Sequence, residues 1–218
     1  NGKLPLSRII LGTATGACCN GENCDEVFNE ALKLGVTTFD TARVYGRSEE
    51  VIGDWLERTG NREKVNLLSK GGHHTPLLKK RVNRKEILSD LEVSLQKLKT
   101  DYIDIYQFHN PSFCPKPGDG TGLYEAMLEA KDQGKIRHIG ITNHRLAVAE
   151  EAIESGLYET LQFPFCYLAS EKDIALVEKC KANHPEMEIA GCATVVDAGK
   201  ARMHMKNFGE FFLDQVKT

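Results

Sequence analysis

Four polar residues stand at or just beyond the ends of short apolar runs in this sequence. Asp40 follows the run at 37–39, and Tyr45 comes shortly after it in a polar loop. Lys70 ends the run VNLLSK, and His109 ends the run DYIDIYQFH. If these runs are neighbouring strands of one parallel sheet, their carboxyl ends share an edge, and the four side chains are expected to meet in one pocket.

Together, these residue types could move a proton onto a carbonyl group that is being reduced. Negative charge develops on the carbonyl oxygen when hydride reaches the carbon, and a positioned phenol such as Tyr45 can donate a proton there. A phenol in water titrates near ~10, so it is a poor acid at neutral pH. The Lys70 ammonium within roughly 4–6 Å would favour the phenolate, the Asp40 carboxylate would hold that ammonium, and the His109 imidazole would orient the carbonyl.

Each of the four residues also has a simpler explanation when it is considered alone. Asp40 could cap a loop through its turn chemistry. Tyr45 could be a packing aromatic residue, Lys70 a solvated strand end, and His109 a hydrogen-bonded histidine at the rim of the fold. Their joint placement at three successive strand ends favours one shared site over four unrelated explanations.

Apolar runs alternate along the chain with amphipathic helical patterns, which indicates an α/β fold with a parallel sheet. Ser48 is expected to be the N-cap of its helix, followed by Glu49 and Glu50 in the favoured first turn. Strands are expected at 8–12, 37–39, 65–69, 102–108, 136–142, 160–163 and 187–192. Helices are expected at 25–34, from Ser48 onward, and at 84–98, 123–133, 147–155 and 171–183.

Seven strand–helix units in a row predict a (β/α)8 TIM-type barrel rather than an open sheet, and we expect one domain over residues 1–218. Such a barrel needs eight strands, and the sequence shows only seven, so the barrel is expected to be incomplete. The run at 195–199 is too short and mixed to be another strand. The tail after it has a helical pattern from about Lys206.

Composition narrows the possible functions. The 218 residues carry a formal net charge of −3 and no basic stripe, so nucleic acid is not an expected partner. No apolar run is long enough to span a bilayer, and the first residues have no leader-like pattern, so no membrane association is expected. The seven cysteines are an odd number at irregular spacings, which predicts reduced thiols in the cytoplasm. Because C-x-x-C spacing is absent, no metal site is expected.

Several motifs occur in an order and spacing that resembles the aldo-keto reductase family. They are DTARVYG with a following Ser-Glu-Glu, LLSKGG, DYIDIYQFHNP and GKIRHIGITNH, and the resemblance covers about Leu6 to Leu168. The family is an eight-stranded barrel that uses NADP(H) or NAD(H). The resemblance implies that Tyr45 is the proton donor, with Asp40, Lys70 and His109 as its supporting residues.

The resemblance also implies residues for the cofactor. Asn143 and Gln162 would hold the nicotinamide carboxamide, although a loop-capping role is the alternative for both. Thr142 stands where the family often has Ser. Cys192 ends the seventh strand, close to where the family usually has a bulky residue against the nicotinamide. A segment that grips the adenosine phosphate has no visible counterpart, so weak NADP(H) binding is expected if this chain is the whole protein.

The resulting hypothesis is an NAD(P)H-dependent reductase that converts a small aldehyde or ketone to an alcohol. The alternative is a non-catalytic or regulatory barrel subunit that keeps the pocket but has lost cofactor retention. The loop residues His73 and His74 are expected to be solvated rather than to contact substrate. The physiological substrate, the preference between the two cofactors and the oligomeric state do not follow from the sequence.

Overall fold

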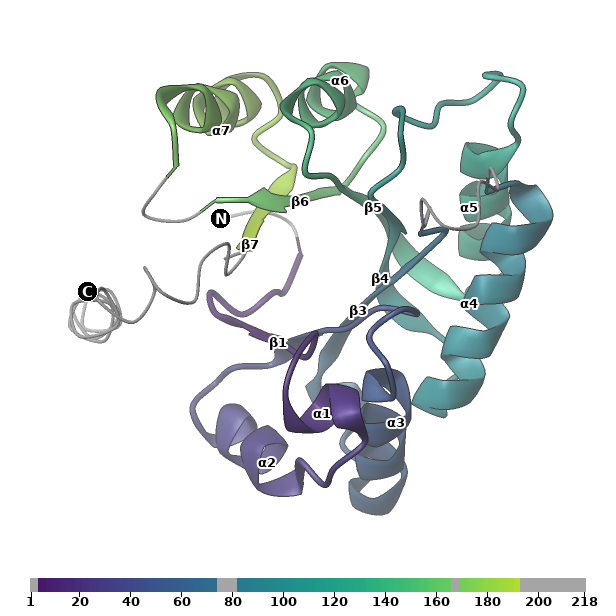
Figure 1. Ribbon diagram of the computed structural model, residues 1–218, viewed down its shortest axis with the longest axis vertical. Helices are drawn as coiled ribbons and strands as arrows, with labels where there is room; N and C mark the ends of the chain where they lie inside the picture. Colours follow the sequence, from purple (N-terminus) through teal and green to yellow (C-terminus); the bar gives the residue numbers. More distant parts are fainter. Residues whose placement is uncertain (1–3, 74–81, 166–168, 193–218) are drawn as a thin grey trace.

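The computed structural model describes residues 4–73, 82–165 and 169–192. Its seven strands form one parallel sheet whose spatial order is the chain order (Figure 1). The parallel α/β arrangement predicted from the sequence is therefore confirmed, with each predicted boundary within two residues of the observed one. The strands are β1 (Ile10–Gly12), β2 (Thr38–Asp40), β3 (Asn66–Gly71), β4 (Ile103–His109), β5 (Ile136–Thr142), β6 (Thr160–Pro164) and β7 (Glu188–Cys192).

The longer helices lie outside the curved sheet, as in a barrel wall (Figure 1). Two short elements, α1 and η1, were not predicted, because a single turn is too short to show a hydrophobic period. The helices are α1 (Ala17–Asn20), α2 (Asp25–Lys33), α3 (Ser48–Thr59), the 3-10 turn η1 (Arg62–Lys64), α4 (Arg84–Leu98), α5 (Leu123–Asp132), α6 (Leu146–Ser155) and α7 (Glu171–Asn183).

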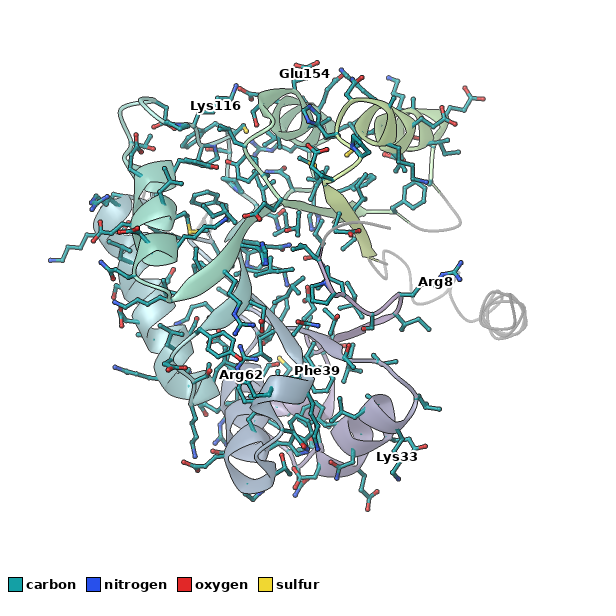
Figure 2. The ribbon with its side chains drawn as sticks, turned by 180° about the vertical axis from the view of Figure 1, so that it is seen from behind. Arg8, Lys33, Phe39, Arg62, Lys116 and Glu154 are labelled. Carbon is teal, nitrogen blue, oxygen red and sulfur yellow. The ribbon has the colours of Figure 1, made fainter. Side chains whose placement is uncertain are left out.

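Side-chain alternation along the strands separates the inner face of the sheet from the outer face. Phe39 on β2 packs outward against Phe28 of α2 and Trp55 of α3, with ring centroids 5.3 and 5.6 Å from its own. Because successive side chains point to opposite faces, the neighbouring Asp40 points inward. The outward-packing residues make the apolar core, and charged side chains such as Lys33, Lys116 and Glu154 project from the outer elements (Figure 2).

The N-terminus of α3 differs from the sequence prediction. The N-cap position is Arg47, which makes no side-chain capping bond, and Ser48 is the first helical residue. The prediction that Ser48 caps the helix was therefore wrong. Its hydroxyl instead faces the ends of β1 and β2. There it donates to Thr13 Oγ1 and accepts a hydrogen bond from Thr41 Oγ1 at 3.0 Å.

The sheet is curled into part of a barrel. Within the described ranges, β1 and β7 are its two end strands and are not paired with each other. The segments in which an eighth strand was sought, 195–199 and the tail from Lys206, lie outside the described residues. No described helix has both the length and the apolar character needed to cross a lipid bilayer.

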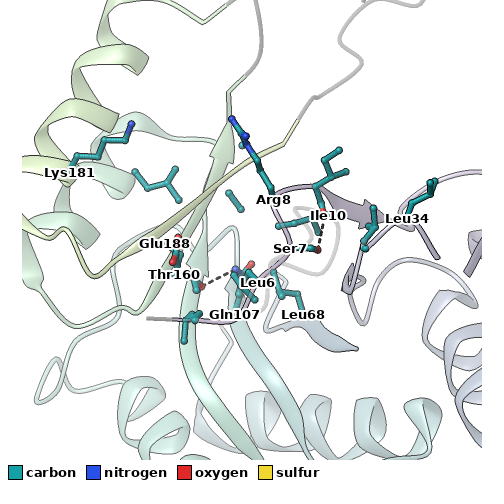
Figure 3. Close-up of a pocket in the computed structure, with 17 residues that line it drawn as sticks. Leu6, Ser7, Arg8, Ile10, Leu34, Leu68, Gln107, Thr160, Lys181 and Glu188 are labelled. Carbon is teal, nitrogen blue, oxygen red and sulfur yellow. Dashed lines mark hydrogen bonds between the residues drawn. The ribbon is translucent and has the colours of Figure 1, made fainter. Parts of the chain in front are cut away.

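A pocket of about 1290 Å³ lies between β1 and β7 on the open side of the curl (Figure 3). Its lining includes the inner-face side chains of Leu68, Gln107 and Thr160. The Gln107 amide donates to Thr160 Oγ1 at 3.1 Å, and its Oε1 has no partner among the described residues. The four predicted catalytic residues are not part of this lining, so this pocket is not the place of the predicted chemistry.

A buried carboxylate ties β4 to its neighbours near the starting ends of the strands. Asp104 accepts from Arg62 Nη2 at 2.8 Å, from Arg137 Nη1 at 3.0 Å and from the Leu67 amide at 2.9 Å. Both guanidinium groups also lie over the Tyr102 ring, 3.8 and 3.9 Å from its centroid. Arg62 is labelled in Figure 2, and the cluster sits at the opposite end of the strands from Lys70 and His109.

Candidate active site

Lys70 is the centre of a buried polar cluster at the carboxyl ends of β2 and β3. Its side chain is 1% exposed, and its Nζ donates to Asp40 Oδ1 at 2.5 Å and to the Thr41 carbonyl at 2.9 Å. An ammonium this deeply buried needs a charged partner, because isolated charges are expensive to remove from water. The structure thus brings together Asp40 and Lys70, which the sequence analysis placed in one site.

Tyr45 completes this cluster from the loop after β2. Its phenolic oxygen lies 3.4 Å from Lys70 Nζ, and the ammonium is 4.8 Å from the centroid of the ring. The loop is held as a tight turn, since the Tyr45 amide donates to the Ala42 carbonyl at 2.9 Å. Gly46 follows at a positive φ of 53°, with the Cys19 carbonyl so close that a side chain would collide with it.

His109 forms the opposite wall of the cluster. Its ring meets the Tyr45 ring edge-on with centroids 5.7 Å apart, and the His73 ring edge-on at 4.6 Å. Burial, and then the nearby positive charge of Lys70, lowers the pKa of His109 from 6.5 to about 2. His109 is therefore a neutral imidazole at physiological pH. The expectation that His73 is a solvated loop residue was wrong, because its ring packs against this wall. His74, for which the same was expected, lies outside the described residues.

The neutral state of His109 predicts how stability depends on pH. In the folded chain His109 binds a proton only near pH 2, whereas in the unfolded chain it does so below its ordinary pKa of 6.5. Between these values the unfolded state binds the extra proton, so stability falls as pH is lowered, by up to about 1.4 kcal/mol per pH unit. Above that window the contribution is constant. In urea unfolding across this range, His109→Gln should show a flatter slope than the parent chain, and identical slopes would contradict the assignment.

The predicted carboxamide-binding residues lie beside the cluster, at the ends of β5 and β6. Thr142 pairs in register with His109 on one side and Gln162 on the other. The side-chain nitrogen of Asn143 donates to the Pro111 carbonyl at 2.7 Å, and its side-chain oxygen accepts from the backbone N–H of Arg145 at 2.8 Å. Asn143 therefore braces its loop, while its NH₂ group and its side-chain oxygen each keep a second hydrogen-bonding position for a ligand.

The structure describes the side-chain surroundings of Gln162 but only the backbone of Cys192. Gln162 is 8% exposed, and its Oε1 has no partner among the described residues, which leaves a buried acceptor at the edge of the cluster. Cys192 pairs with Pro164 through the backbone at the end of β7. Its side chain lies outside the described part of the structure.

The sequence analysis missed a set of buried polar residues behind the cluster. Ser69 lies next to Lys70 and donates to Glu49 Oε1 at 2.7 Å. The Glu-Glu pair after Ser48 was interpreted only as a favourable first turn, and nothing in its spacing distinguishes a buried carboxylate from a solvated one. The alternation of β3 could have given the signal, because it sets Ser69 on the helix-covered face.

A model of the "Aldo/keto reductase family" matches residues 8–208. The chain belongs to the aldo/keto reductase family. The resemblance based on the sequence motifs is therefore confirmed.

Two members of the family illustrate how far the similarity extends. Aldo-keto reductase YhdN of Bacillus subtilis is 34% identical over 189 residues, which are 83% of this chain and 56% of that protein. The NADH-specific methylglyoxal reductase of Escherichia coli is 29% identical over 202 residues, 83% of this chain and 61% of that protein. The chain thus spans a little over half the length of these aldo/keto reductases.

The fold is also that of solved aldo/keto reductases. The holo form of AKR11C1 from Bacillus halodurans superimposes with a TM-score of 0.69 at 24% identity, covering 87% of this chain and 63% of that one. Its fold agrees with the predicted (β/α)8 barrel, of which the described residues here form a curled seven-stranded part.

Proposed function

We propose that the chain carries the proton-transfer half of an NAD(P)H-dependent reduction of a small aldehyde or ketone, with Tyr45 as the proton donor. The observation that carries this proposal is the position of Lys70 Nζ, which contacts both Asp40 Oδ1 and Tyr45 Oη from inside the barrel. An ammonium beside a phenol favours the phenolate, so Tyr45 becomes a stronger acid than a solvated tyrosine.

The neighbouring residues divide the remaining tasks. The Tyr45 hydroxyl gives its proton to the carbonyl oxygen as negative charge develops there, and the Lys70 ammonium stabilises the phenolate that is left. Asp40 keeps the ammonium charged and in place. His109 is neutral, so it cannot be the acid that donates this proton, and it suits a role as hydrogen-bond donor that orients the carbonyl. The phenol then regains its proton from solvent.

The residues at the ends of β5 and β6 suit a nicotinamide. Gln162 presents a buried, unpartnered amide oxygen that can accept from a carboxamide NH₂ group, and Asn143 and Thr142 lie next to it. These three would hold the carboxamide, with Cys192 nearby on β7. When bound, the cofactor supplies hydride to the carbonyl carbon. NADP(H) and NAD(H) are both proposed, and one relative is named as NADH-specific.

The proposal also covers the substrate, the cellular location and the partners of the protein. The substrate is a small carbonyl compound, as the name of the methylglyoxal reductase relative suggests. We place the protein in the cytoplasm, because the five described cysteines are all free thiols. We also propose that residues 1–218 form one domain. Nucleic acid and membranes are not proposed as partners.

The direct test follows the absorbance of reduced nicotinamide in the presence of this chain and methylglyoxal or a simple aliphatic aldehyde. NADPH and NADH are assayed separately, and the alcohol product is quantified. We expect cofactor loss that requires both protein and aldehyde, with one alcohol formed per cofactor oxidised. No loss above the protein-free background with either cofactor would leave the non-catalytic alternative in its place.

A further inference from the structure

The first turn of α3 buries two polar residues, which is unusual for the start of an outer helix. Ser48 and Glu49 are 0% and 3% exposed. Buried polar groups cost free energy unless they are hydrogen-bonded, so such a turn is retained for its contacts rather than for packing. α3 begins only a few residues after Tyr45, and the Ser48 amide donates to the Tyr45 carbonyl at 3.0 Å. Whatever holds this turn therefore also holds Tyr45.

Ser48 fastens the turn to the ends of the first two strands. Its hydroxyl bonds Thr13, just after β1, and Thr41, just after β2. The Thr41 carbonyl in turn accepts from Lys70 Nζ at 2.9 Å. Thr41 thus binds the Lys70 ammonium through its carbonyl and the first turn of α3 through its hydroxyl.

Glu49 fastens the turn to β3 from behind. Its Oε1 accepts from Ser69 Oγ at 2.7 Å, and Ser69 is 0% exposed on the outer face of the strand. Lys70, the next residue, points to the inner face because strand side chains alternate. The contact between Glu49 and Ser69 is called the Glu49–Ser69 link below. It connects the helix that follows Tyr45 with the strand that carries Lys70.

Burying the Glu49 carboxylate costs free energy, which suggests that the Glu49–Ser69 link is kept to position α3 relative to β3. Burial raises the pKa of Glu49, although the nearby hydroxyl groups of Ser94 and Ser69 act in the opposite direction. Its second carboxyl oxygen has no partner within hydrogen-bonding geometry among the described residues. A carboxylate held in this way contributes less to stability than an apolar side chain of similar size would. It does, however, fix the relative position of two elements through a short, charge-assisted hydrogen bond.

We propose that Glu49 is a positioning residue, which through the Glu49–Ser69 link sets the distance between Tyr45 Oη and Lys70 Nζ. The proposal rests on the function proposed above for the identity of the reacting pair. It assigns no contact with substrate or cofactor to Glu49. Ser48 supports the same turn from the side of β1 and β2.

The test measures the titration of Tyr45 by NMR of the chain labelled with ¹³C at the tyrosine Cζ, with the Tyr45 signal assigned by its loss in Tyr45→Phe. If the link sets the distance, Glu49→Ala and Ser69→Ala should each raise the Tyr45 midpoint by about one pH unit, toward the value near 10 of a solvated phenol. Glu49→Gln can still accept from Ser69, so it should restore the parent midpoint. The double variant Glu49→Ala/Ser69→Ala should shift no further than either single change, because one contact is removed in all three.

Two controls separate the possible failures. Asp104→Ala removes another buried carboxylate that bonds β3, but at the far end of the strands, so it should lower thermal stability and leave the Tyr45 midpoint unchanged. Lys70→Met should raise that midpoint more than any link variant. If Lys70→Met shifts it and the link variants do not, the positioning role is overturned while the proposed function stands. If Lys70→Met has no effect either, the proposed function itself fails.

Discussion

Replacing Tyr45 by phenylalanine is expected to lower kcat/KM for aldehyde reduction by about 10²–10⁴-fold, the range over which a positioned general acid contributes. Phenylalanine keeps the ring and its edge-on contact with His109 but has no hydroxyl 3.4 Å from Lys70 Nζ. Neither His109 nor Lys70 is suited to replace the acid, because His109 is neutral and the Lys70 ammonium is occupied by Asp40 and Thr41.

Steady-state rates with each cofactor and a range of aldehyde concentrations would measure this effect. Tyr45 is only half-buried, so the variant should unfold at nearly the parent temperature, which separates lost chemistry from lost fold. Because the phenol must be protonated to act, the parent rate should also fall as pH rises through the Tyr45 pKa, and this limb should be missing in the variant. Equal rates in both chains would remove Tyr45 from the mechanism.

The placement of the site could be predicted because it depends on strong, local patterns. Asp40 and His109 end their strands and Lys70 is next to last in its own, and parallel pairing of β2, β3 and β4 brings those ends together. The period of two then sets all three side chains on the inner face. Tyr45 joins them because the loop after β2 is too short and too tightly bonded to carry it elsewhere.

The contacts behind the site could not be predicted, because they depend on tertiary geometry. Ser48 has the residue type of an N-cap, and only the fold shows that its hydroxyl is used by Thr13 and Thr41 instead. His73 follows two glycines in what resembles an open loop, yet its ring lies against His109. Propensity describes a residue's neighbours in sequence, whereas these contacts join residues that are distant in sequence.

Replacing Asp40 by alanine is expected to lower the free energy of unfolding by about 3–5 kcal/mol, the cost of leaving one member of a buried ion pair without its partner. Lys70 is 1% exposed, so its ammonium cannot reach water without moving the end of β3. The other two acceptors near this ammonium, the Thr41 carbonyl and the Tyr45 hydroxyl, carry no full charge to balance it. Urea unfolding of the parent and the variant at neutral pH would give the difference.

The double variant Asp40→Leu/Lys70→Met separates the two roles of the pair. Apolar side chains of similar volume remove both charges at once, so most of the stability lost in Asp40→Ala should return. The rate of aldehyde reduction should not return, because the phenol no longer has an ammonium beside it. A change below about 0.5 kcal/mol in Asp40→Ala is what an exposed site would give, and it would contradict the buried pair. A double variant that regains both stability and rate would show that the charges of this pair are not needed for the chemistry.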